Sequence, residues 1–127
     1  MSKSDRTLTF KPARIALVGP CASGKSTLAH SLKEIGFEVR QPAQEHSFVP
    51  DMWQRLSKPD VLIFLDVDYK HFQQRRPVND GGPDYLVEQY RRLAHAQRHC
   101  DFYLNTSGLD VEEVKTAVFQ FLQTHFK

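Results

Sequence analysis

The chain carries, at residues 19–27, the sequence Gly19-Pro20-Cys21-Ala22-Ser23-Gly24-Lys25-Ser26-Thr27. A short apolar run at residues 14–18 precedes this loop and predicts a buried strand. Leu28, Leu32 and Ile35 follow it at helical spacing, and Gly36 supplies a helix stop. The segment therefore predicts a sharp turn that leads from a strand directly into a helix.

The spacing Gly-x-x-x-x-Gly-Lys-Ser is complete in this loop. Its glycines let the backbone curl so that successive N–H groups point at phosphate oxygens, and the following helix adds the positive end of its dipole. We therefore expect residues 19–27 to bind a nucleoside triphosphate, with Lys25 on the β- and γ-phosphates, Ser26 on Mg²⁺ and Thr27 near the α-phosphate. A glycine-rich turn that binds nothing is the alternative, and the strand before it and the helix after it favour phosphate binding.

Further along the chain, apolar runs at residues 37–40, 61–67 and 102–105 predict three more strands. Helical patterns alternate with them, beginning after Asp51, after Asp68, at Asp84 and after Asp110. Val111, Val114, Val118, Phe121 and Leu122 are expected to form one apolar stripe on the last helix. This alternation predicts an α/β fold with a parallel sheet of about four strands and helices on both faces.

In such sheets, ligands bind beyond the carboxyl ends of the strands. The 19–27 loop, Gln44, Asp66 and Thr106 all follow predicted strand ends, so we expect them to meet at one edge.

Composition is ordinary for a single globular domain of 127 residues, with 40% hydrophobic and 25% charged residues. Residues 1–12 are expected to be a flexible segment, and residues 78–83 a mobile loop. The net charge of +2 argues against nucleic acid as the main ligand, and no apolar stretch approaches the length of about 20 residues that a membrane helix needs. Cys21 lies inside the loop, where a disulfide would obstruct a ligand, so a reducing, cytoplasmic location is expected.

Three stretches of the chain resemble the P-loop NTPases, and within them the nucleoside and nucleotide kinases: residues 15–28, residues 59–68 with Arg75 and Arg76 after them, and residues 101–114. The resemblance implies a small three-layer P-loop fold that binds ATP and Mg²⁺. It also implies that Arg75 and Arg76 contact the transferring phosphates and that residues 106–109 flank the adenine. Those kinases insert acceptor-binding segments where this chain has only residues 36–58, which leaves the acceptor molecule open.

A second resemblance lies in residues 41–45, which are similar to the second switch of small GTPases. It implies that Gln44 positions an attacking water molecule. Gln41 and Ala43 replace the aspartate and the glycine of that switch, and no Asn-Lys-x-Asp guanine motif occurs in the chain.

Two acidic residues are candidates for the metal or for proton transfer. Asp66 ends the most apolar strand, where it is either the residue that organises Mg²⁺ or a cap for the following turn. Glu45 is either a residue that holds a metal-bound water or accepts a proton, or a solvated loop residue.

Other side chains have less specific interpretations. His95 and His99 have a spacing that can bind zinc, but a surface position is favoured. For Phe48, Met52 and Trp53, a place in the core is favoured over an acceptor cavity.

Three hypotheses follow for the function. The first is an ATP-dependent phosphotransferase that acts on a small molecule, with Lys25, Arg75 and Arg76 around the γ-phosphoryl group. The second is a nucleotide hydrolase or switch that uses Gln44 and is read by a protein partner. The third is a nucleotide-binding module without catalysis.

Overall fold

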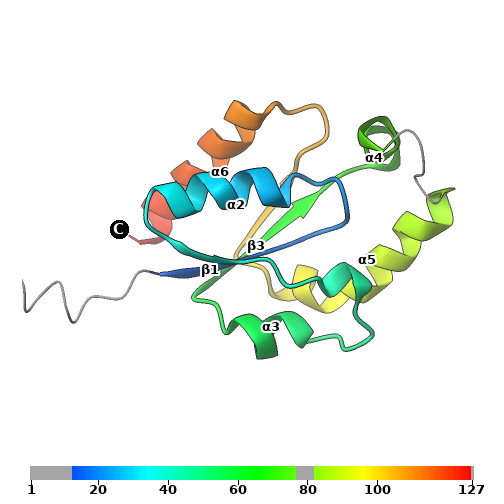
Figure 1. Cartoon of the computed structure of the whole chain (residues 1–127), viewed down its shortest axis with the longest axis horizontal. Helices are drawn as coiled ribbons and strands as arrows, with labels where there is room; N and C mark the ends of the chain where they lie inside the picture. The colour runs from blue at the N-terminus through cyan, green and yellow to red at the C-terminus, as the bar shows by residue number, and fades with distance from the viewer. Residues whose placement is uncertain (1–12, 77–81, 127) are drawn as a thin grey trace, which may run out of the picture.

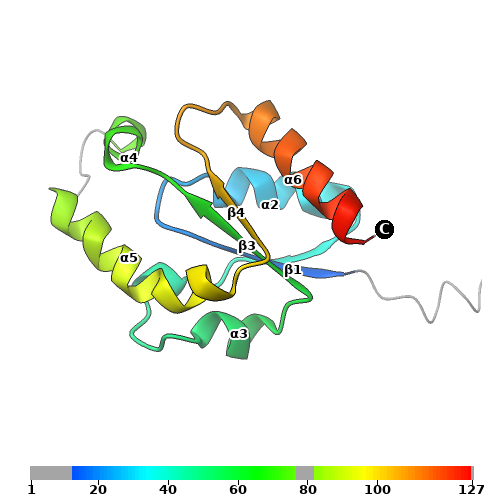
Figure 2. The same cartoon turned by 180° about the vertical axis from the view of Figure 1, so that it is seen from behind.

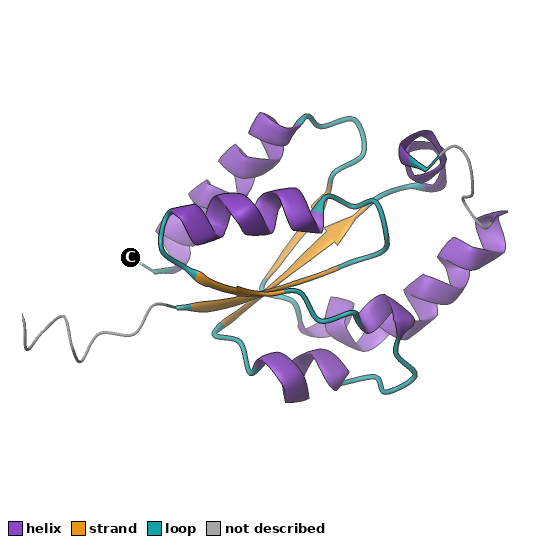
Figure 3. Cartoon of the chain, viewed as in Figure 1, coloured by secondary structure: helices purple, strands orange, loops and turns teal. Residues whose placement is uncertain are grey.

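The computed structural model describes residues 13–76 and 82–126, so the predictions for residues 1–12 and 78–81 lie outside the described residues. The described elements are β1 (Arg14–Val18), α2 (Lys25–Glu34), β2 (Glu38–Arg40), the 3₁₀ helix η1 (Gln44–His46), α3 (Met52–Ser57), β3 (Val61–Asp66), α4 (Tyr69–Arg75), α5 (Gly82–His99), β4 (Phe102–Asn105) and α6 (Val111–His125). Strands and helices alternate as the sequence pattern predicts (Figure 3). None of these described helices combines the length and the apolarity that spanning a lipid bilayer requires.

The strands of the described residues form one sheet in the order β2-β1-β3-β4, and every neighbouring pair is parallel. Every residue of β3 is buried, because the strand has a neighbour on each side and helices on both faces. This confirms the predicted α/β class and the parallel sheet of four strands.

Side chains that alternate along the strands divide the core between two faces of the sheet. Ile15 and Leu17 pack with α2 and α6 on one face. Ala16 and Val18 pack with α3 and α5 on the other face. Figures 1 and 2 show the resulting three layers, with α4 beyond one end of the sheet.

Aspartates begin two of the helices as predicted. The Asp68 carboxylate accepts a hydrogen bond from the backbone N–H of His71, and Asp110 forms a complete capping box with Glu113. Asp51 behaves differently, because its carboxylate makes no cap bond and pairs with Arg55 at 3.0 Å. The helix expected from Asp84 begins at Gly82.

Two predicted core positions are wrong. Val111, assigned to the apolar stripe of α6, is 52% exposed. Phe48 is 82% exposed, and the Arg92 guanidinium lies 4.3 Å from the centre of its ring, whereas Trp53 is buried as expected. Val111 is the first residue of α6 and Phe48 lies in the loop between η1 and α3, and at both places the periodic pattern carries little information.

The 19–27 loop passes directly over the end of β3. Gly19 has φ +152°, and a Cβ atom added there would lie 1.9 Å from the carbonyl oxygen of Leu65. Only glycine therefore allows the loop to lie this close to the sheet.

We predict that Gly19→Ala lowers the free energy of unfolding by about 3 kcal/mol or more, because it adds overpacking to backbone strain. The matched control is Gly108→Ala, where φ is +75° and no heavy atom lies within 4 Å of the added Cβ. The control substitution is expected to lower the free energy of unfolding by about 1 kcal/mol, because only the left-handed backbone is strained there. Denaturant unfolding measures both values, and equal losses would contradict the close approach.

Candidate functional site

A cavity of about 860 Å³ opens where the carboxyl ends of the strands meet. Its walls come from residues 21–28, from Glu45, from Arg75 and Arg76 at the end of α4, and from Thr106 and the start of α6. The volume is in the range of small-molecule sites in proteins, about 300–1,000 Å³. The 19–27 loop, Thr106 and the region around Gln44 thus lie at one edge of the sheet, as predicted.

The amino-terminal end of α2 faces this cavity without a side chain of its own to cap it. Gly24 is the N-cap residue, with φ 99°, and the first turn of α2 contains no acidic residue. The first N–H groups of any α-helix lack a partner within the helix, and the dipole adds partial positive charge there. The end of α2 is therefore suited to binding an anion.

Lys25 is held by partners inside the loop. Its ammonium group donates hydrogen bonds to the carbonyl oxygens of Gly19 and Pro20, and it lies 2.9 Å from Glu45 Oε2. The side chains of Lys25 and Glu45 are only 12% and 8% exposed. An anion that enters the loop can replace these partners of Lys25 with its own oxygens.

Buried polar atoms without partners concentrate at the same cavity. Among residues 13–76 and 82–126, four buried side-chain polar atoms have no hydrogen-bond partner. Three of them belong to residues that line the cavity, namely Ser23 Oγ, Glu45 Oε1 and Arg76 Nη1. The fourth, Arg92 Nε, lies 3.4 Å from Glu88. Because such atoms are rare in folded proteins, their convergence indicates a ligand site.

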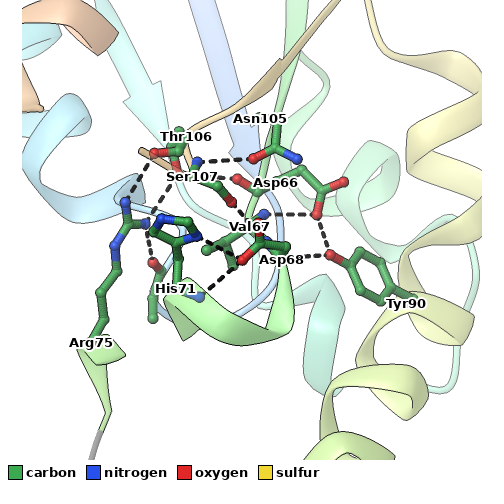
Figure 4. A network of polar contacts seen from close by, with 10 residues as sticks. Asp66, Val67, Asp68, His71, Arg75, Tyr90, Asn105, Thr106 and Ser107 are labelled. Atoms are coloured by element: carbon green, nitrogen blue, oxygen red, sulfur yellow. Dashed lines mark hydrogen bonds and ion pairs between the residues drawn. The ribbon is translucent and has the colours of Figure 1, made fainter. Parts of the chain in front are cut away.

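Arg75 ties the end of α4 to the 19–27 loop. Its guanidinium donates to the carbonyl oxygen of Ala22 at 2.7 Å and to both the hydroxyl and the carbonyl oxygen of Thr106 (Figure 4). The Thr106 hydroxyl in turn lies 2.9 Å from the Ser23 carbonyl oxygen and 3.0 Å from that of Asp66. Arg75 therefore lines the cavity and also shapes the loop.

Arg76 lies over aromatic rings, with its guanidinium carbon 5.5 Å from the ring centre of Phe72 and 5.7 Å from that of Tyr85. This position leaves Nη1 without a hydrogen-bond partner beside the cavity. In all, four basic side chains (Lys25, Arg75, Arg76, Lys115) and two acidic ones (Glu45, Asp110) line the cavity, which favours an anionic ligand.

Asp66 is close to the loop but does not line the cavity. Its Oδ1 accepts from the N–H of Val67 and from the hydroxyl of Tyr90 (Figure 4). Its Oδ2 accepts from the hydroxyl of Tyr103. Both carboxylate oxygens are thus used within the protein. Of its two interpretations, the structure supports the strand-end cap and gives the Mg²⁺ role no geometric support.

Gln44 also has a different position from the one that the sequence suggested. Its side chain is fully buried, donates to the carbonyl oxygens of Val49 and Arg92, and accepts from the N–H of Trp53 at 2.8 Å. Every one of these partners is backbone, and Gln44 does not line the cavity. The side chain anchors residues 44–53 against α5, and it is not available to orient a water molecule there.

Gln89 is a residue of this region that the sequence reasoning missed. It is 1% exposed; its Oε1 accepts from the backbone N–H of Cys21 at 2.8 Å, and its Nε2 donates to Cys21 Sγ at 3.4 Å. Leu86, Gln89 and Leu93 share one face of α5 at helical spacing. A polar residue in that apolar series was the signal that could have identified it.

His95 and His99 do not form a metal site with other described residues. The two rings lie 4.4 Å apart, and His95 Nδ1 accepts a hydrogen bond from the indole N–H of Trp53. Within the described ranges, the one group of His, Cys, Asp and Glu side chains that is close enough to hold a metal ion is Cys21, Glu45 and His46.

The carboxylate of Asp66 helps to raise the pKa of its two tyrosine partners. Partial burial, the hydrogen bond to Asp66 and the negative charge of Asp66 together raise the pKa of Tyr103 to about 12. The same causes raise the pKa of Tyr90. An unfolded tyrosine titrates near 10, so the contribution of Tyr103 to stability is complete below about pH 10 and is lost as the pH rises toward 12.

We predict that Asp66→Asn lowers the pKa of Tyr103, because it removes the charge that opposes the phenolate. The absorbance of tyrosinate, followed against pH with Tyr103→Phe as the reference variant, measures this shift. The loss of stability between about pH 10 and 12 should also be smaller in Asp66→Asn than in the unmodified chain. An unchanged titration would show that Asp66 does not carry the negative charge assigned to it.

A comparison of the sequence with models of known protein families gives no match, and a comparison with curated proteins gives none either. The assignment of function therefore depends on the chemistry of the site.

Proposed function

We propose that this chain binds a nucleoside triphosphate, ATP in the first place, together with Mg²⁺ and transfers its γ-phosphoryl group to a small acceptor molecule. The observation that carries this proposal is the cavity at the start of α2, where unpartnered buried polar atoms and four basic side chains converge. A polyphosphate supplies acceptor oxygens for the N–H groups of α2, and the group that is transferred supplies them for Arg76 Nη1.

Lys25 changes partners when the phosphates bind. It leaves Glu45 and the loop carbonyl groups and contacts the β- and γ-phosphates. Arg75 and Arg76 neutralise charge on the transferring group from the opposite wall of the cavity. The acceptor oxygen bonds to the γ-phosphorus as the bond to the β–γ bridging oxygen breaks, the acceptor proton is released to water, and the nucleoside diphosphate leaves.

Two residues of the cavity fit Mg²⁺, which prefers oxygen ligands. Ser26 is exposed in the first turn of α2, and Glu45 Oε2, which pairs with Lys25, becomes available when Lys25 moves to the phosphates. Glu45 therefore replaces Asp66 as the acidic residue assigned to the metal. When bound with the triphosphate, Mg²⁺ supplies positive charge that offsets the charge of the phosphates.

The apolar part of the cavity supports binding of the base. Leu109, Val111 and Val114 line it on the α6 side, and the exposure of Val111 leaves its side chain free to cover an aromatic ring. Residues 106–109, expected to flank the adenine, include Thr106 and Leu109 in the same wall.

We predict that Lys25→Ala weakens the binding of Mg²⁺ and a non-hydrolysable ATP analogue by about 1–3 kcal/mol, because it removes a charged contact to phosphate. The matched control is Lys33→Ala, since Lys33 is an exposed lysine in the last turn of the same helix. Isothermal titration calorimetry measures both affinities. Equal affinities in Lys25→Ala and the control would refute triphosphate binding at this loop.

Arg76 tests the transfer step better than Arg75, because Arg75 also holds the backbone of the loop. We predict that Arg76→Ala slows phosphoryl transfer by about 10²-fold while the affinity for the ATP analogue changes little. The control is Arg91→Ala on α5, whose arginine side chain is 71% exposed. Turnover is measured as ATP consumption against a panel of nucleosides, nucleotides and sugars.

The same panel separates the three hypotheses. Dependence of ATP consumption on one acceptor supports the phosphotransferase. Consumption at the same rate with and without every acceptor indicates a hydrolase, in which Gln44→Ala should then affect turnover only through stability. Tight binding without any turnover indicates a module without catalysis.

A further inference from the structure

Cys21, Glu45 and His46 form a cluster of three potential metal ligands at the edge of the cavity. Their ligand atoms all lie within 4.8 Å of one another, and Cys21 Sγ is 3.6 Å from His46 Nε2. Cys21 lies in the 19–27 loop, whereas Glu45 and His46 are neighbours in η1. Two segments that are distant in the sequence therefore bring sulfur, nitrogen and oxygen ligands together.

The separation of sulfur and nitrogen agrees with a tetrahedral zinc centre. Zinc bonds of about 2.3 Å to sulfur and 2.0–2.1 Å to nitrogen, at the tetrahedral angle, place those two atoms about 3.6 Å apart. The third ligand is the carboxylate of Glu45, whose Oε1 is buried and has no partner. A carboxylate oxygen of Glu45 lies within 4.8 Å of both the sulfur and the nitrogen.

The buried carboxylate is independent support for a cation. The Glu45 side chain is 8% exposed, and the ion pair with Lys25 satisfies only its Oε2. A carboxylate oxygen without a hydrogen bond is costly at this depth, and a metal ion would satisfy it. Oε2 can keep Lys25 while Oε1 binds the metal.

Gln89 supports the sulfur ligand from the protein side. Its amide donates to Cys21 Sγ and accepts from the backbone N–H of Cys21. It therefore holds both the sulfur atom and the backbone of Cys21 in place. Groups of this kind, which orient a ligand from outside the metal centre, commonly raise metal affinity. His46 is exposed, which leaves the fourth side of the cluster open to solvent or to a ligand in the cavity.

We propose that Cys21, Glu45 and His46 bind Zn²⁺, with the fourth coordination position open. A thiolate, an imidazole and a carboxylate suit Zn²⁺ and not Mg²⁺, which prefers oxygen ligands alone. The site is therefore distinct in its chemistry from the Mg²⁺ position at Ser26. It does not require that a nucleotide be bound.

The test measures metal binding to the full chain at neutral pH in the absence of nucleotide. Calorimetric titration with Zn²⁺ gives the affinity, and Co²⁺ as an optical probe gives a thiolate-to-cobalt absorption band. The variants are Cys21→Ala and His46→Gln, with Cys100→Ala and His99→Gln as matched controls away from the cluster. We expect each cluster variant to weaken Zn²⁺ binding by about tenfold or more, and Cys21→Ala to lose the cobalt band. Both controls should bind as the unmodified chain does.

Two results would overturn the proposal. One is a lack of saturable Zn²⁺ binding to the unmodified chain. The other is Zn²⁺ binding that falls in the His99→Gln or Cys100→Ala control and stays unchanged in the cluster variants. Circular dichroism checks that each variant is folded, and the exposed position of His46 keeps His46→Gln informative if Cys21→Ala is unstable.

Discussion

The close contact between the 19–27 loop and the carboxyl end of β3 is the constraint on which the site depends. Gly19 lies against the carbonyl group of Leu65, and Thr106 bridges the carbonyl oxygens of Ser23 and Asp66. The two contacts fix the start and the middle of the loop relative to the sheet. Without these two contacts, the backbone N–H groups of the loop would not point in a fixed direction. The amino-terminal end of α2 would then no longer face a defined cavity.

The positive charge of Lys25 in this loop is balanced by the negative charge of Glu45. Lys25 and Glu45 are both largely buried, and each neutralises the other. A buried ion pair gains less than its short distance suggests, because both groups lose their hydration. Under the proposed function, Lys25 gains a more highly charged partner, and Mg²⁺ takes its place beside Glu45, because a buried carboxylate left without a partner is costly.

The sequence predicted the elements that have a strong periodic or capping signal. The strand at residues 14–18, the glycine stop after α2 and the capping box at Asp110 are all found in the structure. The cavity at the loop was also predicted, because the carboxyl ends of parallel strands must meet at one edge.

The sequence could not predict the roles of Gln44 and Asp66, because their partners are distant in the chain. Gln44 bonds to the backbone of Arg92, and Asp66 bonds to the hydroxyl groups of Tyr90 and Tyr103. Packing between elements decides which partners a polar side chain bonds to. A local sequence motif carries no information about that packing.

The three-way junction of Ala22, Arg75 and Thr106 has a consequence for how the sequence can diverge. Ala22 contributes only its main-chain oxygen to the junction, while its side chain packs against the cluster of Val67, Phe72 and Leu86. Arg75 and Thr106 bond to each other through side-chain atoms. In a set of homologues, substitutions at positions 75 and 106 should therefore be correlated, whereas position 22 should vary independently of both.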